Sequence, residues 1–215
     1  ITPCIVSHRI GSTDSAALVN SANNDLVGTN LPYFPVGGPV PKQPPRDVLR
    51  LARNWGGMEI GENQVYPSQV VDGHVSELGG YSLLQACQAL PVQNPRTGHR
   101  CLVGGAVVTP ASEGLAHNFD WILHTVAPFY ADTDWAERLQ ECYLSIIALA
   151  RAHDLSSLAC PLLGAGARGA PSSEAAAVAA AALSAAQLPK EEDLPQLLFK
   201  FGVVDDGVFR VVHEA

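Results

Sequence analysis

Apolar positions along the chain follow two spacings, one typical of strands and one typical of helices. Short apolar runs bounded by polar or glycine-rich segments predict strands. They fall at residues 3–10, 15–20, 101–109, 120–126, 157–163 and 197–204, with a weaker run at 208–213. Apolar residues at i, i+3, i+4 and i+7 predict helices over residues 81–90, 134–153 and 172–188. Strands that alternate with helices predict α/β layers around a mainly parallel sheet.

The segment from Gly28 to Pro67 breaks this pattern. It contains seven prolines and two Gly-Gly pairs, a composition that predicts loop structure. A short helix over residues 46–55 is the one other element that its sequence predicts. A loop of this length inside a compact domain is usually functional or partly disordered. We interpret residues 28–69 as an insertion within a single domain of residues 1–215.

The composition sets limits on the class of protein. Hydrophobic residues make up 47% of the 215 residues and charged residues 16%, so the chain can bury a sizeable core. The net charge is −8 and the chain has no Lys/Arg run, which argues against a protein that binds nucleic acid through its phosphates. The apolar stretch at residues 174–188 is too short and too weak to span a membrane.

The cysteines and histidines favour no disulfide and no metal site. Five cysteines, an odd number, are spread through apolar surroundings without a C-x-x-C pair, which indicates reduced core residues of an intracellular protein. The seven histidines show no H-x-H or H-x-x-x-H spacing, so no metal is predicted. The chain begins at Ile1 instead of Met, which we interpret as a piece processed or excised from a longer protein.

A glycine-rich turn from Gly164 to Gly169 lies between an apolar strand and a helix. Backbone with few side chains at such a junction can turn successive N–H groups toward an anion, and the helix dipole adds its positive end. A phosphate is therefore the predicted occupant. The same residues fit G-x-G-x-x-G, but a dinucleotide-binding fold places that motif after its first strand. A purely structural tight turn is the remaining alternative.

Two further polar segments carry candidate chemistry. Asn20-Ser21-Ala22-Asn23 follows the second predicted strand, and Val71-Asp72-Gly73 follows the proline-rich segment. Side-chain amides at the carboxyl end of a strand are suited to hydrogen-bonding ribose hydroxyls or a water without adding charge beside a phosphate. An asparagine-rich turn without a ligand is the simpler interpretation.

Together these segments resemble a macrodomain, the ADP-ribose-binding α/β/α module. Residues 17–23 are similar to the family's A-I-V-N-A-A-N, and residues 71–73 to its V-D-G. Residues 101–130 resemble C-x-x-G-x-A-x-x-T…V-I-H-T-V-G-P-x-Y, and residues 161–171 match P-x-I-S-T-G-I-F-G-Y-P in register, with Cys142-Tyr143 on the expected helix. The resemblance implies a three-layer α/β/α fold with a mixed, mostly parallel central sheet.

The resemblance also implies roles for individual residues. Asn23 and Asp72 match the positions that hold or activate a water beside the distal ribose in MacroD-like hydrolases. An unpaired carboxylate near a diphosphate should keep a raised affinity for protons and serve as a general base through one water. No cofactor is implied. The implied ligand-binding residues are Asn20, Ala22, Gly56, Gly57, Val71, Gly73, Gly164, Ala165, Gly166, Ala167, Arg168 and Gly169.

The chain departs from the family pattern in the glycine run that covers the phosphates. That run stands directly between the Asn and V-D-G in the family, whereas 48 residues separate Asn23 from Asp72 here. Either Gly37-Gly38 or Gly56-Gly57 can supply the missing cover. We favour Gly56-Gly57 because fewer residues then separate the cover from Asp72.

Other departures concern the two ends of the ligand. The family's G-D-I-T falls at His8-Arg9-Ile10-Gly11, so the Asp that meets adenine is absent, and Asp14 is either a shifted substitute or a turn residue. The family's His after V-D-G falls at Ser76, with His74 nearby. Arg168 stands where an aromatic residue often packs on the distal ribose, and its guanidinium can stack there or pair with a phosphate or carboxylate.

Two buried candidates and three functions complete the expectations. His124 is predicted to be a core histidine, and Cys160 a buried thiol without a catalytic role.

The first function is hydrolysis of mono-ADP-ribosyl esters, on protein carboxylates or in O-acetyl-ADP-ribose. The second is a reader that binds ADP-ribose without turnover inside a longer protein, and the third is a scaffold whose insertion fills the cleft. The expected partner is ADP-ribose or an ADP-ribosylated protein, bound by a monomeric domain.

Overall fold

The centre of the molecule is a five-stranded sheet in the order β4-β5-β1-β6-β7. The computed structural model describes residues 16–28, 34–35, 64–65, 70–187, 197–202, 208, 210 and 212–213. The strands are β1 (Ala16–Ser21), β4 (Ala106–Pro110), β5 (Trp121–Thr125), β6 (Ser157–Pro161) and β7 (Leu198–Gly202). Only β4 runs antiparallel to its neighbour, β5, while the other three pairings are parallel. The mixed, mostly parallel sheet is thereby confirmed.

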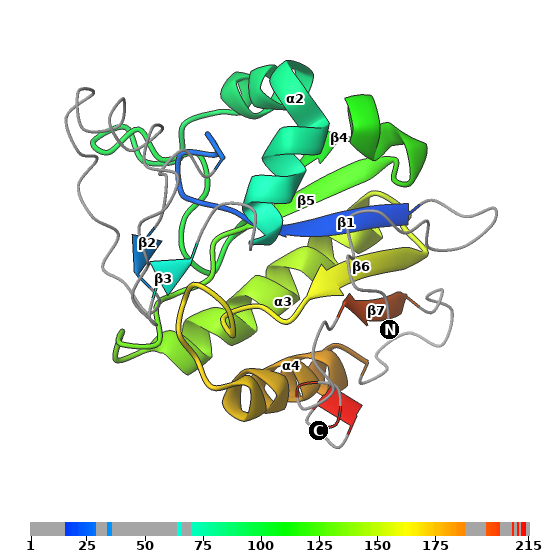
Figure 1. Cartoon of the computed structure of the whole chain (residues 1–215). Coiled ribbons are helices and arrows are strands. Elements are labelled where there is room, and N and C mark those ends of the chain that lie inside the picture. Colours follow the sequence, from blue (N-terminus) through cyan, green and yellow to red (C-terminus); the bar gives the residue numbers. More distant parts are fainter. Residues whose placement is uncertain are drawn as a thin grey trace.

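Helices cover both faces of this sheet, as Figure 1 shows. The helix α2 (Val71–Ala89) lies on one face, and α3 (Trp135–Ala152) and α4 (Ser172–Gln187) lie together on the other. A short 3-10 helix, η3 (Glu113–His117), packs against α2. The expected three-layer α/β/α arrangement is confirmed. In the described part of the chain, no helix combines the length and apolar character needed to span a membrane.

Strand β1 shows why the sheet needs two covering layers. Ala17 and Val19 belong to the core beneath α3 and α4, whereas Ala16 and Leu18 belong to the core beneath α2. Successive side chains of a strand point to opposite faces, so a strand that is apolar at every position must be buried on both sides. The carboxyl end of β1 then projects its polar residues from between the two layers.

Helix α3 has an apolar stripe that fixes its orientation on the sheet. Leu139, Tyr143, Ile146 and Ala150 recur at helical spacing and are fully buried. Helix α4 begins at Ser172, directly after the glycine-rich turn, so its N-terminus lies beside that turn.

Two predicted elements differ in the structure. Helix α2 is two helical stretches joined by a kink at Gly80: the second corresponds to the helix predicted from residue 81, and the first, which begins at Val71, was not predicted. Gly80 has φ 57° and ψ −152°, a conformation that favours glycine. The described residues among 208–213 are helical instead of extended, since apolar residues at 208, 209, 211 and 212 also fit a helical repeat.

Other predictions fall on the part of the chain outside the described residues. These are the strand at residues 3–10 and the helix at residues 46–55. Of residues 28–69, the structure describes Gly28 and a two-stranded antiparallel piece formed by β2 (Phe34–Pro35) and β3 (Gln64–Val65). Four cysteines are buried free thiols, as predicted: Cys87, Cys101, Cys142 and Cys160.

Candidate functional site

The glycine-rich turn after β6 is held at both ends by glycines with left-handed backbone. Gly164 has φ 83° and Gly169 has φ 84°, and the amide of Ala170 donates to the carbonyl of Gly164 at 3.0 Å. The amide of Tyr130 donates to the carbonyl of Arg168 at 2.9 Å, which ties the turn to the segment after β5. The turn is therefore a closed backbone loop at the carboxyl edge of the sheet.

The middle of this loop keeps backbone donors available. Within the described residues, the amides of Gly166, Ala167 and Arg168 donate no hydrogen bond to the protein. Adjacent unpaired N–H groups, together with the N-terminus of α4 just after them, favour an anion such as a phosphate. The turn thus has the available N–H groups and the adjacent helix N-terminus from which the phosphate site was predicted.

Asp72 lies in the first turn of α2, on the other helical layer. Its side chain is 6% exposed, and its Oδ1 accepts a hydrogen bond of 2.9 Å from Asn20 Nδ2 at the end of β1. The expectation of an unpaired carboxylate was wrong, because the end of β1 places an amide donor against it. The N-terminus of a helix also favours the negative charge of a carboxylate in its first turn.

Asn23 has a different set of contacts from Asn20. Its Nδ2 donates to the carbonyl of Gly28 at 2.7 Å, and its Oδ1 accepts from the amide of Val27 at 3.3 Å. These bonds shape the loop that leaves β1. Both groups of the Asn23 amide therefore hold the loop in this structure, and the amide that contacts Asp72 belongs to Asn20.

Arg168 connects the glycine-rich loop with the end of β1. Its guanidinium stacks over the ring of Phe129, with 4.3 Å between the guanidinium carbon and the ring centroid, and Nη2 donates to the carbonyl of Ala22 at 3.5 Å. Burial lowers the pKa of Arg168, and the nearby charges of Asp72 and Asp132 oppose that shift. The side chain thus lies in the field of the carboxylate that the sequence proposed for catalysis.

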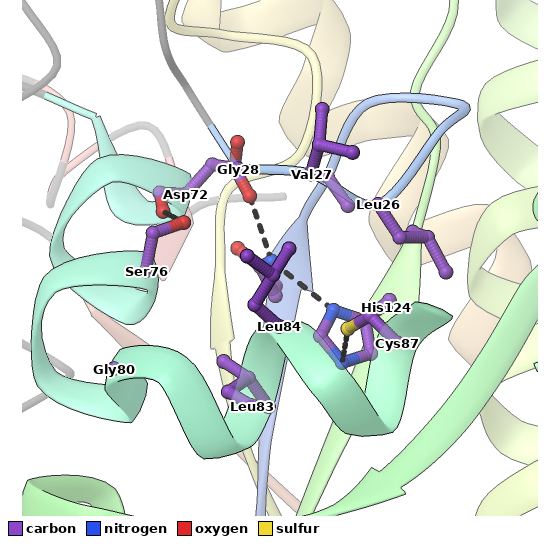
Figure 2. A pocket seen from close by; sticks show the side chains of 12 residues that line it. Leu26, Val27, Gly28, Asp72, Ser76, Gly80, Leu83, Leu84, Cys87 and His124 are labelled. Carbon is purple, nitrogen blue, oxygen red and sulfur yellow. Dashed lines mark hydrogen bonds between the residues drawn. The ribbon is translucent and has the colours of Figure 1, made fainter. Parts of the chain in front are cut away.

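A cavity of about 170 Å³ lies beside Asp72, between the end of β1, the loop after it and α2 (Figure 2). Most small-molecule sites enclose roughly 300–1,000 Å³, so this space accommodates only part of a nucleotide-sized ligand. Its polar members are grouped around Asn20 and its other walls are mainly apolar. The lining residues are Asn20, Ala22, Leu26, Val27, Gly28, Asp72, Ser76, Gly80, Leu83, Leu84, Cys87 and His124.

The structure brings several of the expected ligand-binding residues to one edge of the sheet. The ends of β1 and β6 and the first turn of α2 meet there, and Arg168 spans two of them. The residues placed there are Asn20, Ala22, Asn23, Val71, Asp72, Gly73, Gly164, Ala165, Gly166, Ala167, Arg168 and Gly169. The two candidate glycine pairs, at 37–38 and 56–57, and Asp14 lie outside the described residues.

Three residues at this edge have contacts that the sequence did not indicate. Gly28 has φ 72°, and a Cβ there would overlap Ser76 Oγ of α2. Phe129 supplies the ring beneath the Arg168 guanidinium. His124, predicted to be a core residue, is buried and hydrogen-bonded to Asn20. Its register opposite Asn20 in the β1–β5 pairing is a tertiary feature, so no signal local to either segment could have revealed the contact.

The described residues offer no other obvious reactive group. No cluster of three or more His, Cys, Asp or Glu side chains suited to a metal ion occurs among them. Burial raises the pKa of the Cys87 thiol to about 11 and that of Cys101 to about 12, and it raises the pKa of Cys160 as well. These thiols are therefore protonated near neutral pH and are poor nucleophiles.

Comparison with known proteins identifies the fold family. A family model described as Macro domain matches residues 56–179, more than half of the chain. The chain belongs to the Macro domain family. This macrodomain is 36% identical over 111 residues to a Macro domain-containing protein of Ralstonia nicotianae and 35% identical over 116 residues to an O-acetyl-ADP-ribose deacetylase of Salmonella gallinarum. These matches cover 51% and 53% of this chain, and they span about three fifths of the relatives, 58% and 61% of their lengths.

Solved structures give the same fold. The Oceanobacillus iheyensis macrodomain with MES bound has a TM-score of 0.63 at 24% identity, covering 94% of this chain and 83% of that one. A point mutant of the same protein with ADPR has a TM-score of 0.63 at 25% identity, covering 93% of this chain and 83% of that one. The Trypanosoma brucei macrodomain in complex with ADP-ribose has a TM-score of 0.59 at 20% identity, covering 92% and 62%.

Proposed function

We propose that this macrodomain binds ADP-ribose and hydrolyses mono-ADP-ribosyl esters, formed on protein carboxylates or present in O-acetyl-ADP-ribose. Two of its relatives are named O-acetyl-ADP-ribose deacetylases, and two structures with its fold are described with ADPR or ADP-ribose. In this proposal the diphosphate lies against the loop from Gly164 to Gly169. The distal ribose lies between that loop and Asp72.

One observation carries the proposal. Arg168 belongs to the loop that is suited to phosphates, yet its guanidinium reaches the carbonyl of Ala22 at the end of β1 and lies in the field of Asp72. A cation of the glycine-rich loop thereby lies close enough to a buried carboxylate from another layer of the fold for their charges to interact. A ligand with a diphosphate and an ester a short distance away from it fits that combination.

The proposed chemistry assigns one step to Asp72. A water bonds to the ester carbon, and the carboxylate of Asp72 takes up the proton that the water loses. The ester C–O bond breaks, and the proton passes to the leaving oxygen, which gives ADP-ribose and a free carboxylic acid. The charge of Arg168 and the N-terminus of α2 both favour the ionised carboxylate that this step requires.

Asn23 is proposed to hold the attacking water. Its Nδ2 donates to Gly28 and its Oδ1 accepts from Val27, and because an amide nitrogen has two hydrogens, the second N–H can orient a water. The second candidate function is a reader that binds ADP-ribose and leaves the ester intact. Both candidate functions use the loop from Gly164 to Gly169 to bind ADP-ribose. They differ in whether Asp72 takes part in hydrolysis of the ester.

The remaining proposals concern the organisation of the chain. We take residues 1–215 as one domain in which residues 28–69 are an insertion, because β1 and α2 on either side of it contribute Asn20 and Asp72 to one site. Gly56-Gly57 is proposed to cover the phosphates. The proposed reaction uses water alone and needs no cofactor.

The test measures release of ADP-ribose from a protein that carries a carboxylate-linked mono-ADP-ribose. Asp72→Asn keeps the size of the side chain and removes its basic oxygen, so turnover should fall to background while ADP-ribose binding persists in calorimetry. Asp154→Asn is the matched control, because Asp154 is exposed in a turn with φ 52° that asparagine also adopts.

The outcomes separate the candidates. Turnover by the unmodified chain and by Asp154→Asn, lost in Asp72→Asn, supports the hydrolase. Equal turnover in all three chains would rule out Asp72 as the base. Binding of ADP-ribose without turnover in any chain favours the reader, and the lack of a calorimetric signal with ADP-ribose would count against both and favour the scaffold.

A further inference from the structure

A buried chain of hydrogen bonds leads from Asp72 into the sheet (Figure 2). Asn20 Nδ2 donates to Asp72 Oδ1 at 2.9 Å and lies 3.2 Å from His124 Nδ1. His124 Nε2 lies 2.9 Å from Thr109 Oγ1 and 3.7 Å from Cys87 Sγ. Asn20, His124 and Thr109 are each 2% exposed, so these bonds are largely shielded from bulk water.

The proton positions in this chain follow from the chemistry of its members. The nitrogen of an Asn amide donates two hydrogen bonds and accepts none, so His124 Nδ1 must be the acceptor. The proton of the neutral imidazole is then on Nε2, where Thr109 Oγ1 accepts it. Burial lowers the pKa of His124 to about 4, so the ring is neutral near pH 7. Both hydrogens of Asn20 Nδ2 are consumed, one by Asp72 and one by His124.

The oxygen of the same amide shows how strongly the orientation of Asn20 is fixed. Asn20 Oδ1 is buried and has no hydrogen-bond partner among the described residues. An unsatisfied buried acceptor costs free energy, and rotating the amide would bring Oδ1 against the oxygen of Asp72 and against His124 Nδ1. The two acceptors therefore hold Asn20 in one orientation even though its oxygen is left without a donor.

We propose that His124 is a positioning residue for Asp72 and acts through Asn20. Neutral His124 fixes the orientation of the Asn20 amide, and that amide fixes where Asp72 Oδ1 lies. The donor of Asn20 sets the tautomer of His124, and Thr109 Oγ1 stabilises it by accepting from Nε2–H. The consequence for turnover rests on the proposed function, since Asp72 needs a fixed position only if it acts on a bound substrate or water. The geometric consequence does not depend on turnover.

The experiment compares three substitutions of the relay in the whole chain. His124→Gln offers a side-chain oxygen that can accept from Asn20, whereas His124→Leu removes the acceptor at similar size. Thr109→Val is close to isosteric and removes the acceptor for Nε2–H. Ile146→Ala is the stability control, because Ile146 is fully buried on α3 beneath the opposite face of the sheet.

Kinetics give the first readout. His124→Leu should lower kcat for the mono-ADP-ribosyl ester about tenfold or more, since small displacements of reacting groups cost up to about 100-fold. KM should change little, and His124→Gln should restore most of kcat. If Ile146→Ala, matched for loss of stability, lowers kcat as much as His124→Leu, His124 is only structural and the proposal is overturned.

Nuclear magnetic resonance gives a readout that is independent of turnover. The ¹⁵N shifts of His124 should show a bare Nδ1 and a protonated Nε2 at pH 7, with part of this preference lost in Thr109→Val. The carboxyl ¹³C resonance of Asp72 should move in His124→Leu and stay near its original position in His124→Gln. A proton on Nδ1, or an Asp72 resonance that His124→Leu leaves unchanged, overturns the proposal even in a chain without hydrolase activity.

Discussion

The guanidinium of Arg168 lies over the ring of Phe129, with its carbon 4.3 Å from the ring centroid. The only hydrogen bond that this side chain makes within the described residues is the long one to the carbonyl of Ala22. A guanidinium carries five N–H donors, so most of its donors are available to a ligand. A cation that is held by a ring and largely unpaired is suited to an anion at this edge of the sheet.

Replacing Arg168 by Gln should weaken ADP-ribose binding. A hydrogen bond to a charged group contributes about 1.5–3 kcal/mol, so we expect the dissociation constant to rise by roughly 10- to 100-fold. The dependence of that constant on salt should also become shallower, because one cation no longer faces the ligand. Calorimetry from 50 mM to 500 mM NaCl, roughly spanning the range in which screening strengthens, measures both effects.

Arg151→Gln is the control for charge. Arg151 is exposed near the end of α3, and its Nη2 donates to the carbonyl of Ala186 on α4, away from the glycine-rich loop. Its loss should leave the dissociation constant and the salt dependence unchanged. If Arg151→Gln and Arg168→Gln change the dissociation constant and its salt dependence equally, the net charge of the protein, and not a contact of Arg168 with the ligand, explains the weaker binding.

Replacing Gly166 by Val should impair binding without loss of stability. A Cβ at Gly166 meets no atom within 4 Å, and its backbone is not left-handed, so the fold should accept the side chain. The side chain would crowd the unpaired amides of Ala167 and Arg168 that we assign to a phosphate. Thermal unfolding should be nearly unchanged while ADP-ribose binding falls tenfold or more, about 1.4 kcal/mol. Unchanged binding would show that the phosphates lie elsewhere.

Replacing Gly28 by Ala should destabilise the protein more than replacing Gly98 by Ala. Both glycines have left-handed backbone, with φ 72° and 80°. Each substitution should therefore cost about 1 kcal/mol of backbone strain. A Cβ at Gly98 meets nothing within 4 Å, whereas one at Gly28 overlaps Ser76 Oγ. Urea unfolding should give a larger loss for Gly28→Ala, and Ser76→Ala in the same chain should recover part of it.

The buried His124 predicts how stability depends on pH. Its pKa falls to about 4 from an ordinary 6.5, so between these values the unfolded chain binds more protons than the folded one. Stability should therefore decrease as the pH falls from about 6.5 to about 4, by on the order of 3 kcal/mol from this group. Urea unfolding of His124→Gln should lack this part of the decrease.

His117→Gln is the matched control for that measurement. His117 is exposed at the end of η3, so its replacement should leave the pH dependence of the parent chain intact. If His124→Gln and His117→Gln both follow the parent curve between pH 6.5 and 4, the imidazole of His124 is not the group responsible.

The sequence by itself determined the layers of this protein and the loop after β6. The apolar runs that became β1, β5 and β6 and the helical stripes of α3 and α4 are local patterns, and each follows from the burial of one face or of both. The glycine-rich turn was likewise readable, because backbone conformation at Gly164 and Gly169 is set by local sterics.

The tertiary structure decided which polar groups meet. Asn20 and Asp72 are separated by 51 residues of sequence and touch because β1 ends beside the first turn of α2. Asn20 and His124 meet because the parallel register of β1 with β5 sets them opposite each other. Hydrogen bonds between side chains depend on register and on the contact between layers, and neither is encoded within a single segment. For that reason the sequence predicted an unpaired carboxylate at Asp72, whereas the fold pairs it with Asn20.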